Sequence, residues 1–236
     1  MPYSKLRGSE SLSRVSHQSR FSCLYLPDVF PERNKLMSDH NAICNCDPES
    51  RCGENCINRA MNYLCGKECP CGDLCENKSL AKRRMVPTKV VYTGARGFGL
   101  IVQEDVKEGD FVTDYRGEVI SLETFIQRIG DEYKGHRNFY ALAYDQDEVI
   151  DAGMRGNDAR YINHSCDPNL EVRKYQQTGD GIEEYEVGMW AIKDIPKGTE
   201  LSYDYNFDSF AAATETELRT RCHCGAANCV GFLGRK

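Results

Sequence analysis

The sequence predicts a mostly β protein with short helices, flanked by two cysteine-rich modules in which metal replaces a hydrophobic core. Short β-prone runs separated by glycine-containing turns recur at 89–92, 98–103, 111–120, 139–144, 148–152, 170–175, 185–192 and 200–203. Eight of the thirteen cysteines fall between Cys44 and Cys75, and three between Cys222 and Cys229. The long alternation of strands and helices expected of a Rossmann-type fold is missing.

Elements outside the β-prone runs are few. Residues 1–38 form an N-terminal tail, serine-rich and predicted to be partly disordered, in which the apolar, aromatic segment 21–36 is suited to docking on a partner. A helix is predicted from Leu122 to about Tyr133, capped by Ser121. A helical turn is predicted at 157–162. The similar segments 105–110 and 194–199 predict two alike strand-to-strand turns.

Composition excludes several classes of protein. The net charge of −6 argues against a protein that wraps DNA and suits a basic peptide partner. The sequence has no run of 18 apolar residues, so no membrane association is expected. The N-terminus lacks the apolar core of a secretory signal, and an odd number of cysteines disfavours a complete disulfide framework.

The cysteine spacing indicates zinc. The front cluster reads C44-x-C46-x5-C52-x3-C56-x8-C65-x3-C69-x-C71-x3-C75, and such close pairs chelate one tetrahedral ion readily. Eight cysteines permit two separate four-cysteine sites, or a bridged arrangement with fewer ligands. Buried free thiols or disulfides are the alternative. The rear cluster, C222-x-C224-x4-C229, supplies three ligands and leaves one position open, as in a catalytic zinc site.

Two segments carry a family resemblance. Arg160-Tyr161-Ile162-Asn163-His164-Ser165-Cys166 and Glu200-Leu201-Ser202-Tyr203-Asp204-Tyr205, in this order and between cysteine clusters, resemble the paired signatures of the SET-domain protein-lysine methyltransferases. The resemblance implies an AWS (associated with SET) zinc module at 39–85, a SET catalytic domain at 86–207 with knot-like C-terminal threading, a gating loop at 208–217 and a post-SET zinc module at 218–236.

The resemblance also implies three structural zinc ions. One is bound by Cys44, Cys46, Cys52 and Cys56, and a second by Cys52, Cys65, Cys69 and Cys75, with Cys52 bridging and Cys71 spare. The third is bound by Cys166, Cys222, Cys224 and Cys229. Because Cys166 belongs to the first signature, this last ion would hold the C-terminal tail over the active site.

The implied cofactor is S-adenosylmethionine, whose methyl group passes to a lysine. By resemblance, the catalytic residues are Tyr205, Tyr140 and Tyr203. Phe98 stands where the family usually has Trp, and relatives have His or Tyr where Phe139 stands. His164 is expected to position the cofactor, not to act as a general base. The implied cofactor-binding residues are Arg96, Gly97, Phe98, Asn138, Phe139, Tyr140, Arg160, Asn163, His164, Tyr205 and His223.

The substrate is implied by the family alone. Within the family, the chain most resembles the enzymes that methylate lysine 36 of histone H3, and residues 203–210 are similar to the absent, small, or homeotic (Ash) branch. Nucleosomes and the H3 tail are then the expected partners, in nuclear chromatin. A Tyr at 203 predicts mono- and dimethylation. Another lysine substrate, or an inactive zinc-stapled chromatin-binding module, remains the alternative.

Three further expectations concern regulation and partners. The gating loop should lie over the lysine channel and inhibit the enzyme, with Ser209 and Phe210 at its tip. Leu24-Tyr25-Leu26-Pro27 resembles the motif by which Ash-branch enzymes engage an MRG-domain subunit, with packing on the chain's own surface as the alternative. Lys82, Arg83 and Arg84 could make a weak DNA contact, although so short a run is usually a solvated face.

Overall fold

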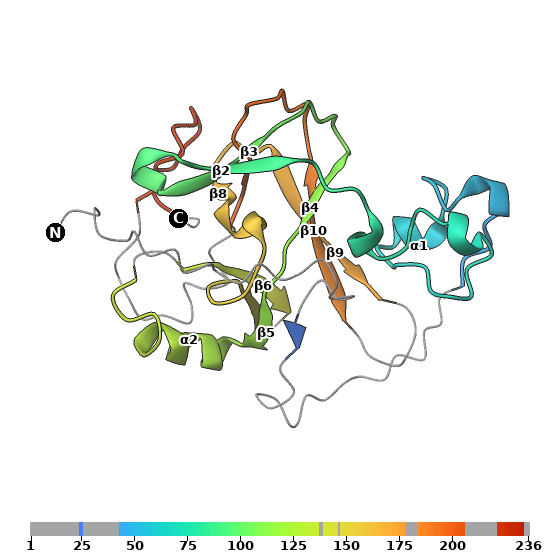
Figure 1. Cartoon of the computed structure of the whole chain (residues 1–236), viewed down its shortest axis with the longest axis horizontal. Helices are drawn as coiled ribbons and strands as arrows, with labels where there is room; N and C mark the ends of the chain where they lie inside the picture. Colours follow the sequence, from blue (N-terminus) through green and yellow to red (C-terminus); the bar gives the residue numbers. More distant parts are fainter. Residues whose placement is uncertain are drawn as a thin grey trace.

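The chain folds into three small β-sheets with short helices between them. The computed structural model describes residues 24–25, 43–136, 139–145, 147–177, 184–205 and 221–233. A five-stranded sheet runs in the order β4-β10-β9-β11-β8, a four-stranded sheet in the order β1-β5-β7-β6, and β2 and β3 form a hairpin. Mostly β structure with few, short helices was predicted, and it is confirmed (Figure 1).

The five-stranded sheet carries the main core. Its strands are β4 (Phe111–Asp114), β8 (Asn163–His164), β9 (Leu170–Gln176), β10 (Tyr185–Ala191) and β11 (Ser202–Tyr203). The antiparallel pair β9 and β10 lies at its centre. Six of the seven residues of β10 are buried, among them one charged side chain, Glu186. Leu170, Val187 and Met189 join residues of β3 in one hydrophobic cluster.

The four-stranded sheet is covered by the longest helix. The sheet contains β5 (Glu118–Ser121), β6 (Ala141–Asp145) and β7 (Glu148–Asp151), and α2 (Leu122–Gly130) packs on β5 and β7 (Figure 1). Ser121 caps α2 as predicted, since its side chain accepts a hydrogen bond from the Thr124 N–H. The helix ends at Gly130, earlier than predicted, and Tyr133 follows in a turn where it still packs on Phe125.

Several predicted strand boundaries were wrong, each for a local reason. The predicted run 111–120 is two strands, β4 and β5, which belong to different sheets. The chain changes sheet at Gly117, where a Cβ would lie 2.6 Å from the Asp151 carbonyl oxygen, so only glycine fits. The last predicted run shortens to Ser202–Tyr203. Its partner β8 was not predicted, because two residues give no periodicity.

The hairpin of β2 (Thr88–Tyr92) and β3 (Phe98–Val102) is closed by a 3₁₀ turn, η4 (Gly94–Arg96). The two alike turns predicted at 105–110 and 194–199 lie side by side. Val106 and Ile195 form a β-bridge, Asp194 accepts a hydrogen bond from the Glu108 N–H, and Asp105 accepts one from the Lys197 N–H. A further 3₁₀ turn, η5 (Asp158–Tyr161), takes the place of the predicted turn at 157–162.

The front cysteine-rich module has few apolar side chains of its own. It contains α1 (Ile57–Ala60) and the 3₁₀ turns η1 (Pro48–Ser50), η2 (Gly72–Leu74) and η3 (Leu80–Lys82). Its interior cluster consists of cysteines. The module stands beside β9, where the Leu64 N–H donates to the Gln176 carbonyl (Figure 1). Leu64 and Leu80 pack against Tyr175 and Trp190 of the five-stranded sheet, which attaches the module to the main core.

Part of the N-terminal docking segment contacts the chain itself. β1 (Leu24–Tyr25) pairs in parallel with β5, at Glu118 and Val119. Packing on the chain's own surface was one of the two interpretations of this segment, and this pairing agrees with it. The rest of 21–36 lies outside the described residues.

Candidate active site and metal centres

The two signature segments meet through one short strand pair. β8 and β11 run in parallel, with Asn163 opposite Ser202 and His164 opposite Tyr203. β11 also pairs with β9 at Leu170, and the Asn169 side chain accepts from the Ser202 N–H and donates to the Glu200 carbonyl. Residues 31 to 39 positions apart in the sequence therefore lie side by side, as a shared site requires.

Tyr205 is held in place by hydrogen bonds to the first signature. Its hydroxyl donates to the Ile162 carbonyl at 2.8 Å, and its backbone N–H donates to Nδ1 of His164 at 3.2 Å. The Tyr203 ring lies 4.7 Å from the Tyr205 ring, centroid to centroid. Burial raises the pKa of Tyr205, and the neighbouring Tyr140 raises it further, so the phenol keeps its proton at any working pH. Burial likewise raises the pKa of Tyr203 well above its ordinary value.

His164 is a structural residue of this site. Burial lowers its pKa below the ordinary value, and the nearby Asp204 opposes that shift only in part. A neutral ring is consistent with Nδ1 accepting the Tyr205 N–H. Nε2 of His164 lies 3.5 Å from Sγ of Cys166. Both ring nitrogens thus lie close to groups of the protein itself. The expected role of His164 in positioning the cofactor stays a prediction.

A second group of aromatic residues surrounds Arg160. The Arg160 guanidinium lies over the Tyr161 ring at 4.9 Å and over the Tyr140 ring at 5.8 Å, and the two rings meet edge to face. Its Nη1 donates to the carbonyl of Ala152 at 3.0 Å. Its Nε is buried and has no hydrogen-bond partner in the described part of the chain. Tyr140 and Tyr205 both pack against the main core, beside the fully buried Tyr115.

Glu200 links the hairpin loop to the first signature. Its carboxylate accepts from Arg96 at 2.7 Å and from the Asn163 amide at 2.9 Å, and the same amide donates to the Phe98 carbonyl at 3.0 Å. Gly97 has a φ of 77°, a left-handed conformation that favours glycine. A Cβ at Gly99 would lie 2.5 Å from the Glu200 carboxylate, so glycine also permits this close approach.

Sequence reasoning missed Glu200 as a site residue. Glu200 stands directly before Leu201-Ser202-Tyr203 and was read only as part of the signature. Its partners Arg96 and Asn163 are distant in sequence, and only the β8–β11 pairing brings them to it. Tyr161 was also missed, although it lies between two residues that were quoted with it. An aromatic residue next to a predicted site arginine was the available signal.

The remaining predicted cofactor residues are placed less centrally. Phe98 is 53% exposed, with its ring 6.0 Å from that of Tyr161. Phe139 is 44% exposed and lies 6.3 Å from the Tyr133 ring, at the edge of the site. His223 is exposed between two cysteines. Asn138, and Ser209 and Phe210 of the gating loop, lie outside the described residues.

The rear cysteines converge with Cys166. Sulfur atoms of Cys166, Cys222, Cys224 and Cys229 all lie within 4.8 Å of one another. The Asn228 side chain also donates to the Cys166 carbonyl at 2.8 Å. Burial raises the pKa of Cys224, but backbone N–H groups outweigh it and lower the pKa to about 6, which suits a thiolate ligand. The C-terminal segment is thereby attached two residues after His164.

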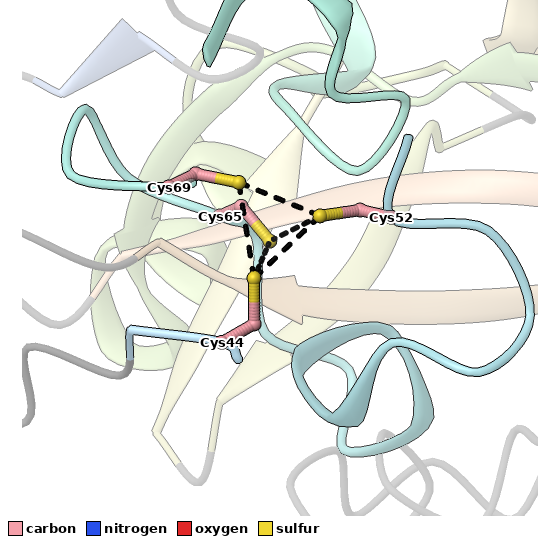
Figure 2. Close-up of side chains that lie close together, drawn as sticks. All are labelled: Cys44, Cys52, Cys65 and Cys69. Carbon is pink, nitrogen blue, oxygen red and sulfur yellow. Dashed lines mark hydrogen bonds between the residues drawn. The ribbon is translucent and has the colours of Figure 1, made fainter. Parts of the chain in front are cut away.

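The front cysteines form two overlapping sets of four. Cys44, Cys46, Cys52 and Cys56 form one set, as the resemblance implied. Cys44, Cys52, Cys65 and Cys69 form the other (Figure 2). Their sulfur atoms are separated by 3.4 Å for Cys52–Cys69, 3.5 Å for Cys44–Cys52 and 3.9 Å for Cys52–Cys65. Tetrahedral zinc with Zn–S bonds of about 2.3 Å separates its sulfur ligands by about 3.8 Å, so the donor set fits zinc.

The second set differs from the predicted one in a single residue. Cys44 stands where Cys75 was expected, while Cys75 is buried and interacts with Cys52 and Cys69. Cys71, predicted to be spare, is also buried, with its sulfur 3.4 Å from that of Cys52. The ligand assignment of Cys75 and the role of Cys71 stay predictions.

The SET domain family matches residues 97–206, and the AWS domain family matches residues 47–83. The chain belongs to the SET-domain proteins that carry an AWS domain. A crystal structure of the methyltransferase domain of human SETMAR matches this chain with a TM-score of 0.61 and 30% sequence identity. The match covers 72% of this chain and 66% of the SETMAR chain.

Several curated proteins that are similar to the chain are named histone-lysine N-methyltransferases. ASHH1 of Arabidopsis thaliana is 38% identical over 225 residues, which are 92% of this chain and 44% of ASHH1. NSD3 of Mus musculus is 43% identical over 197 residues, 81% of this chain and 13% of NSD3. A human enzyme named as H3 lysine-36 specific is 41% identical over 197 residues, 81% of this chain and 7% of its own. The chain thus spans less than half the length of these relatives.

KRYPTONITE, solved in complex with mCHH DNA, an H3(1-15) peptide and SAH, shares the fold. The match covers 90% of this chain and 46% of the KRYPTONITE chain, with a TM-score of 0.65 and 26% identity.

The helices in the described part of the chain are short, and α2 is the longest of them. No helix among them is long and apolar enough to cross a membrane.

Proposed function

We propose that the chain is the catalytic part of a protein-lysine N-methyltransferase that transfers methyl groups from S-adenosylmethionine to lysine 36 of histone H3 in nucleosomes. The observation that carries the proposal is the β8–β11 pair, which brings Asn163 and His164 of the first signature beside Tyr203 and Tyr205 of the second. The names of the relatives support the lysine and histone specificity, and a chromatin location in the nucleus follows from that substrate.

The residues of the site fit an amino-acid cofactor. S-adenosylmethionine carries a carboxylate and an ammonium group, and it supplies an electrophilic methyl group when bound. Arg96 and the buried, unpaired Nε of Arg160 could receive an anionic group, while Glu200 and the Phe98 carbonyl suit a cationic one. We propose that Arg96, Gly97, Phe98, Asn163 and His164 hold this cofactor, with Asn138, Phe139, Arg160 and His223 at its edges.

The tyrosines would prepare the substrate amine. A lysine amine with a pKa of about 10.4 costs about 4–5 kcal/mol to deprotonate at pH 7. Burial in an aromatic channel disfavours the ammonium form and lowers that cost. Tyr205 and Tyr203 keep their protons, because burial raises their pKa, so they orient the amine by hydrogen bonds instead of removing a proton. Ring faces would hold the cationic product.

A nucleosome assay tests this function directly. Recombinant nucleosomes with single lysine substitutions in H3 are incubated with the chain and labelled S-adenosylmethionine. We expect label in wild-type nucleosomes and in all variants except that of lysine 36. Label that follows another lysine would replace the substrate assignment, and no label on any nucleosome or free histone would leave the inactive chromatin-binding module as the function.

The degree of methylation is proposed to depend on Tyr203. Its hydroxyl limits the space for a third methyl group, so the unmodified enzyme gives mono- and dimethyllysine, and Tyr203→Phe gives more trimethyllysine. Mass spectrometry of the reacted H3 peptide measures this. Abundant trimethyllysine from the unmodified chain would contradict the assignment.

Two further parts of the proposal concern segments of which little or nothing lies within the described ranges. An autoinhibitory loop at 208–217 is proposed to cover the lysine channel, so Phe210→Ala should raise the rate on nucleosomes. An unchanged rate would remove the loop from the proposal. Binding of an MRG-domain protein to residues 21–36 is tested by deleting 1–36, which should abolish binding in a pull-down.

A further inference from the structure

The side chain of Asn157 bridges the peptide groups on both sides of Tyr115. Its Oδ1 accepts a hydrogen bond from the Arg116 N–H at 3.2 Å. Its Nδ2 donates to the Asp114 carbonyl at 2.8 Å and to the Asp114 carboxylate at 2.9 Å. One amide group, 41 to 43 positions away in the sequence, therefore fixes both the residue before Tyr115 and the residue after it.

Asn157 makes these contacts in place of an ordinary helix cap. It occupies the N-cap position of η5, where an asparagine side chain usually accepts a hydrogen bond from the first turn. Its side chain makes no such bond and reaches the segment between β4 and β5 instead. Gly156 permits this approach, because a Cβ there would lie 2.7 Å from the Arg116 carbonyl oxygen. The start of η5 is thus shaped by its contact with the residues around Tyr115.

A buried ion pair orients the Asn157 amide. The Asp114 side chain is fully buried and lies 2.6 Å from Nη2 of Arg116, which is itself nearly buried. Burial raises the pKa of Asp114, and hydrogen bonds from Arg116 and Asn157 oppose that shift. A buried ion pair is weak evidence for stability, whereas its directed hydrogen bonds restrict the geometry of the groups around it. We therefore expect these three residues to fix a geometry more than to raise stability.

The geometry that they fix is that of a cluster of tyrosines. Tyr115 is 2% exposed and belongs to the same hydrophobic cluster as Tyr203, and Tyr205 packs against that cluster. Burial raises the pKa of Tyr115, and the neighbouring Tyr205 raises it further. Tyr115 in turn adds to the rise in the pKa of Tyr203. The three phenols thus share one poorly solvated place, and a shift of Tyr115 would change the surroundings of the other two.

We propose that Asn157 is a positioning residue, which holds Tyr115 in place against the two tyrosines of the proposed active site. η5 contacts the tyrosines at both ends, because its N-cap residue holds the backbone around Tyr115 and its C-cap residue, Ile162, accepts the Tyr205 hydroxyl. This inference deepens the proposed function and rests on it for the reaction that the tyrosines serve. Asn157 acts through Tyr115, so its loss should slow the chemical step more than it weakens cofactor binding.

The first test compares Asn157→Ala with the control Tyr144→Phe. The Tyr144 hydroxyl lies in the same core, where it accepts a hydrogen bond from the Tyr185 N–H at 2.8 Å. We expect Asn157→Ala to lower kcat on an H3 peptide roughly tenfold to hundredfold, as a misplacement of about 1 Å does, and to change KM for S-adenosylmethionine less than about twofold. Tyr144→Phe should lower the Tm and leave kcat unchanged.

A second variant, Asn157→Asp, keeps the shape of the side chain. It retains the acceptor for the Arg116 N–H and places an acidic group beside the Asp114 carboxylate. The charged groups that face it are Asp114 and Arg116, with Glu186 of β10 close to both. A like charge raises the pKa of the new carboxyl, and its protonated form donates to Asp114 as the amide does. The ratio of the variant's kcat to that of the unmodified chain should therefore rise as the pH falls through that pKa.

Nuclear magnetic resonance of isotope-labelled tyrosine rings gives a readout without catalysis. Asn157→Ala should shift the ring resonances of Tyr115, Tyr203 and Tyr205 and leave those of Tyr144 in place. A chain that shows these shifts but methylates nothing would overturn the proposed function and leave this inference standing. Unshifted tyrosine resonances would overturn the inference. So would a loss of kcat no larger than that of Tyr144→Phe, or a kcat ratio for Asn157→Asp that does not change with pH.

Discussion

The two tyrosines of the proposed site, Tyr203 and Tyr205, keep protonated hydroxyls because burial raises the pKa of each. Tyr205 donates to a backbone carbonyl of the first signature, and Glu200 collects hydrogen bonds from two residues that come from different parts of the chain. Tyr205 and Glu200 thus each connect two segments of the chain. A substitution at Tyr205 tests a chemical role, and a substitution at Glu200 tests a positioning role.

Tyr205→Phe should lower methyl transfer by roughly 10²–10³-fold, because the hydroxyl that orients the reacting groups is lost. Cofactor binding should change little, since the backbone N–H that donates to His164 remains. Single-turnover rates and calorimetric titration with S-adenosylhomocysteine measure the two effects. Retention of most activity would show that Tyr205 is misassigned.

Glu200→Gln should raise KM for S-adenosylmethionine roughly tenfold, equivalent to about 1.4 kcal/mol, and change kcat little. The amide cannot neutralise Arg96, so the hairpin loop loses its charged anchor. The matched control is Glu171→Gln, which removes the carboxylate of an exposed pair with Arg173. Equal KM values for the two variants would remove Glu200 from the positioning residues.

At the scale of elements, short pieces of chain are held by metal ligands and by tertiary pairing. β8 and β11 are two residues each, too short to persist alone, and the rear cysteines attach the C-terminal segment beside them. The front module replaces a core by sulfur atoms.

Cysteine substitutions should distinguish the cysteines of the front module that bind two zinc ions from those that bind none. Cys52→Ser should reduce zinc by two ions per chain, because Cys52 belongs to both sets of four. Cys71→Ser should leave the zinc content unchanged, and it serves as the control. Metal analysis by mass spectrometry decides between them. Fewer than two ions in the unmodified chain would contradict the zinc assignment altogether.

Cys229→Ser should weaken the rear site alone. We expect one zinc ion fewer and a lower rate of methyl transfer, because the C-terminal segment is no longer attached to Cys166 beside His164. Thermal unfolding of the main core should shift only slightly. If the rate is unchanged after zinc is lost from this site, the rear zinc is not needed to build the active site.

At the scale of the whole molecule, the SET core and the front cysteine module differ in how much hydrophobic packing stabilises them. The main hydrophobic cluster lies in the SET core, while the front module joins it through Leu64 and Leu80 against Tyr175 and Trp190. Glu186 accepts the Leu80 N–H at this junction, although burial raises its pKa. We therefore expect the front module to depend on zinc for its stability, whereas the core depends on packing.

Zinc chelation should accordingly unfold the cysteine modules before the core. A strong chelator should abolish activity while amides of β9 and β10 stay protected from hydrogen exchange. Adding zinc back should restore both modules. Simultaneous loss of protection throughout the chain would show that the modules and the core unfold as one unit.

The sequence by itself determined the mostly β class, the capped start of α2, the cysteine clusters and the two signatures. These features depend on side chains that are close together in the sequence, so they can be recognised from the sequence alone. It did not determine where 111–120 divides, because the change of sheet depends on Gly117 meeting Asp151 from another strand.

Only the tertiary structure decided how the signatures combine and what lies between them. β8 pairs with β11 across 37 intervening positions or more, and that pairing alone makes Glu200 a partner of Arg96 and Asn163. Contacts between residues far apart in sequence leave no periodic trace, so such sites emerge only from the folded chain.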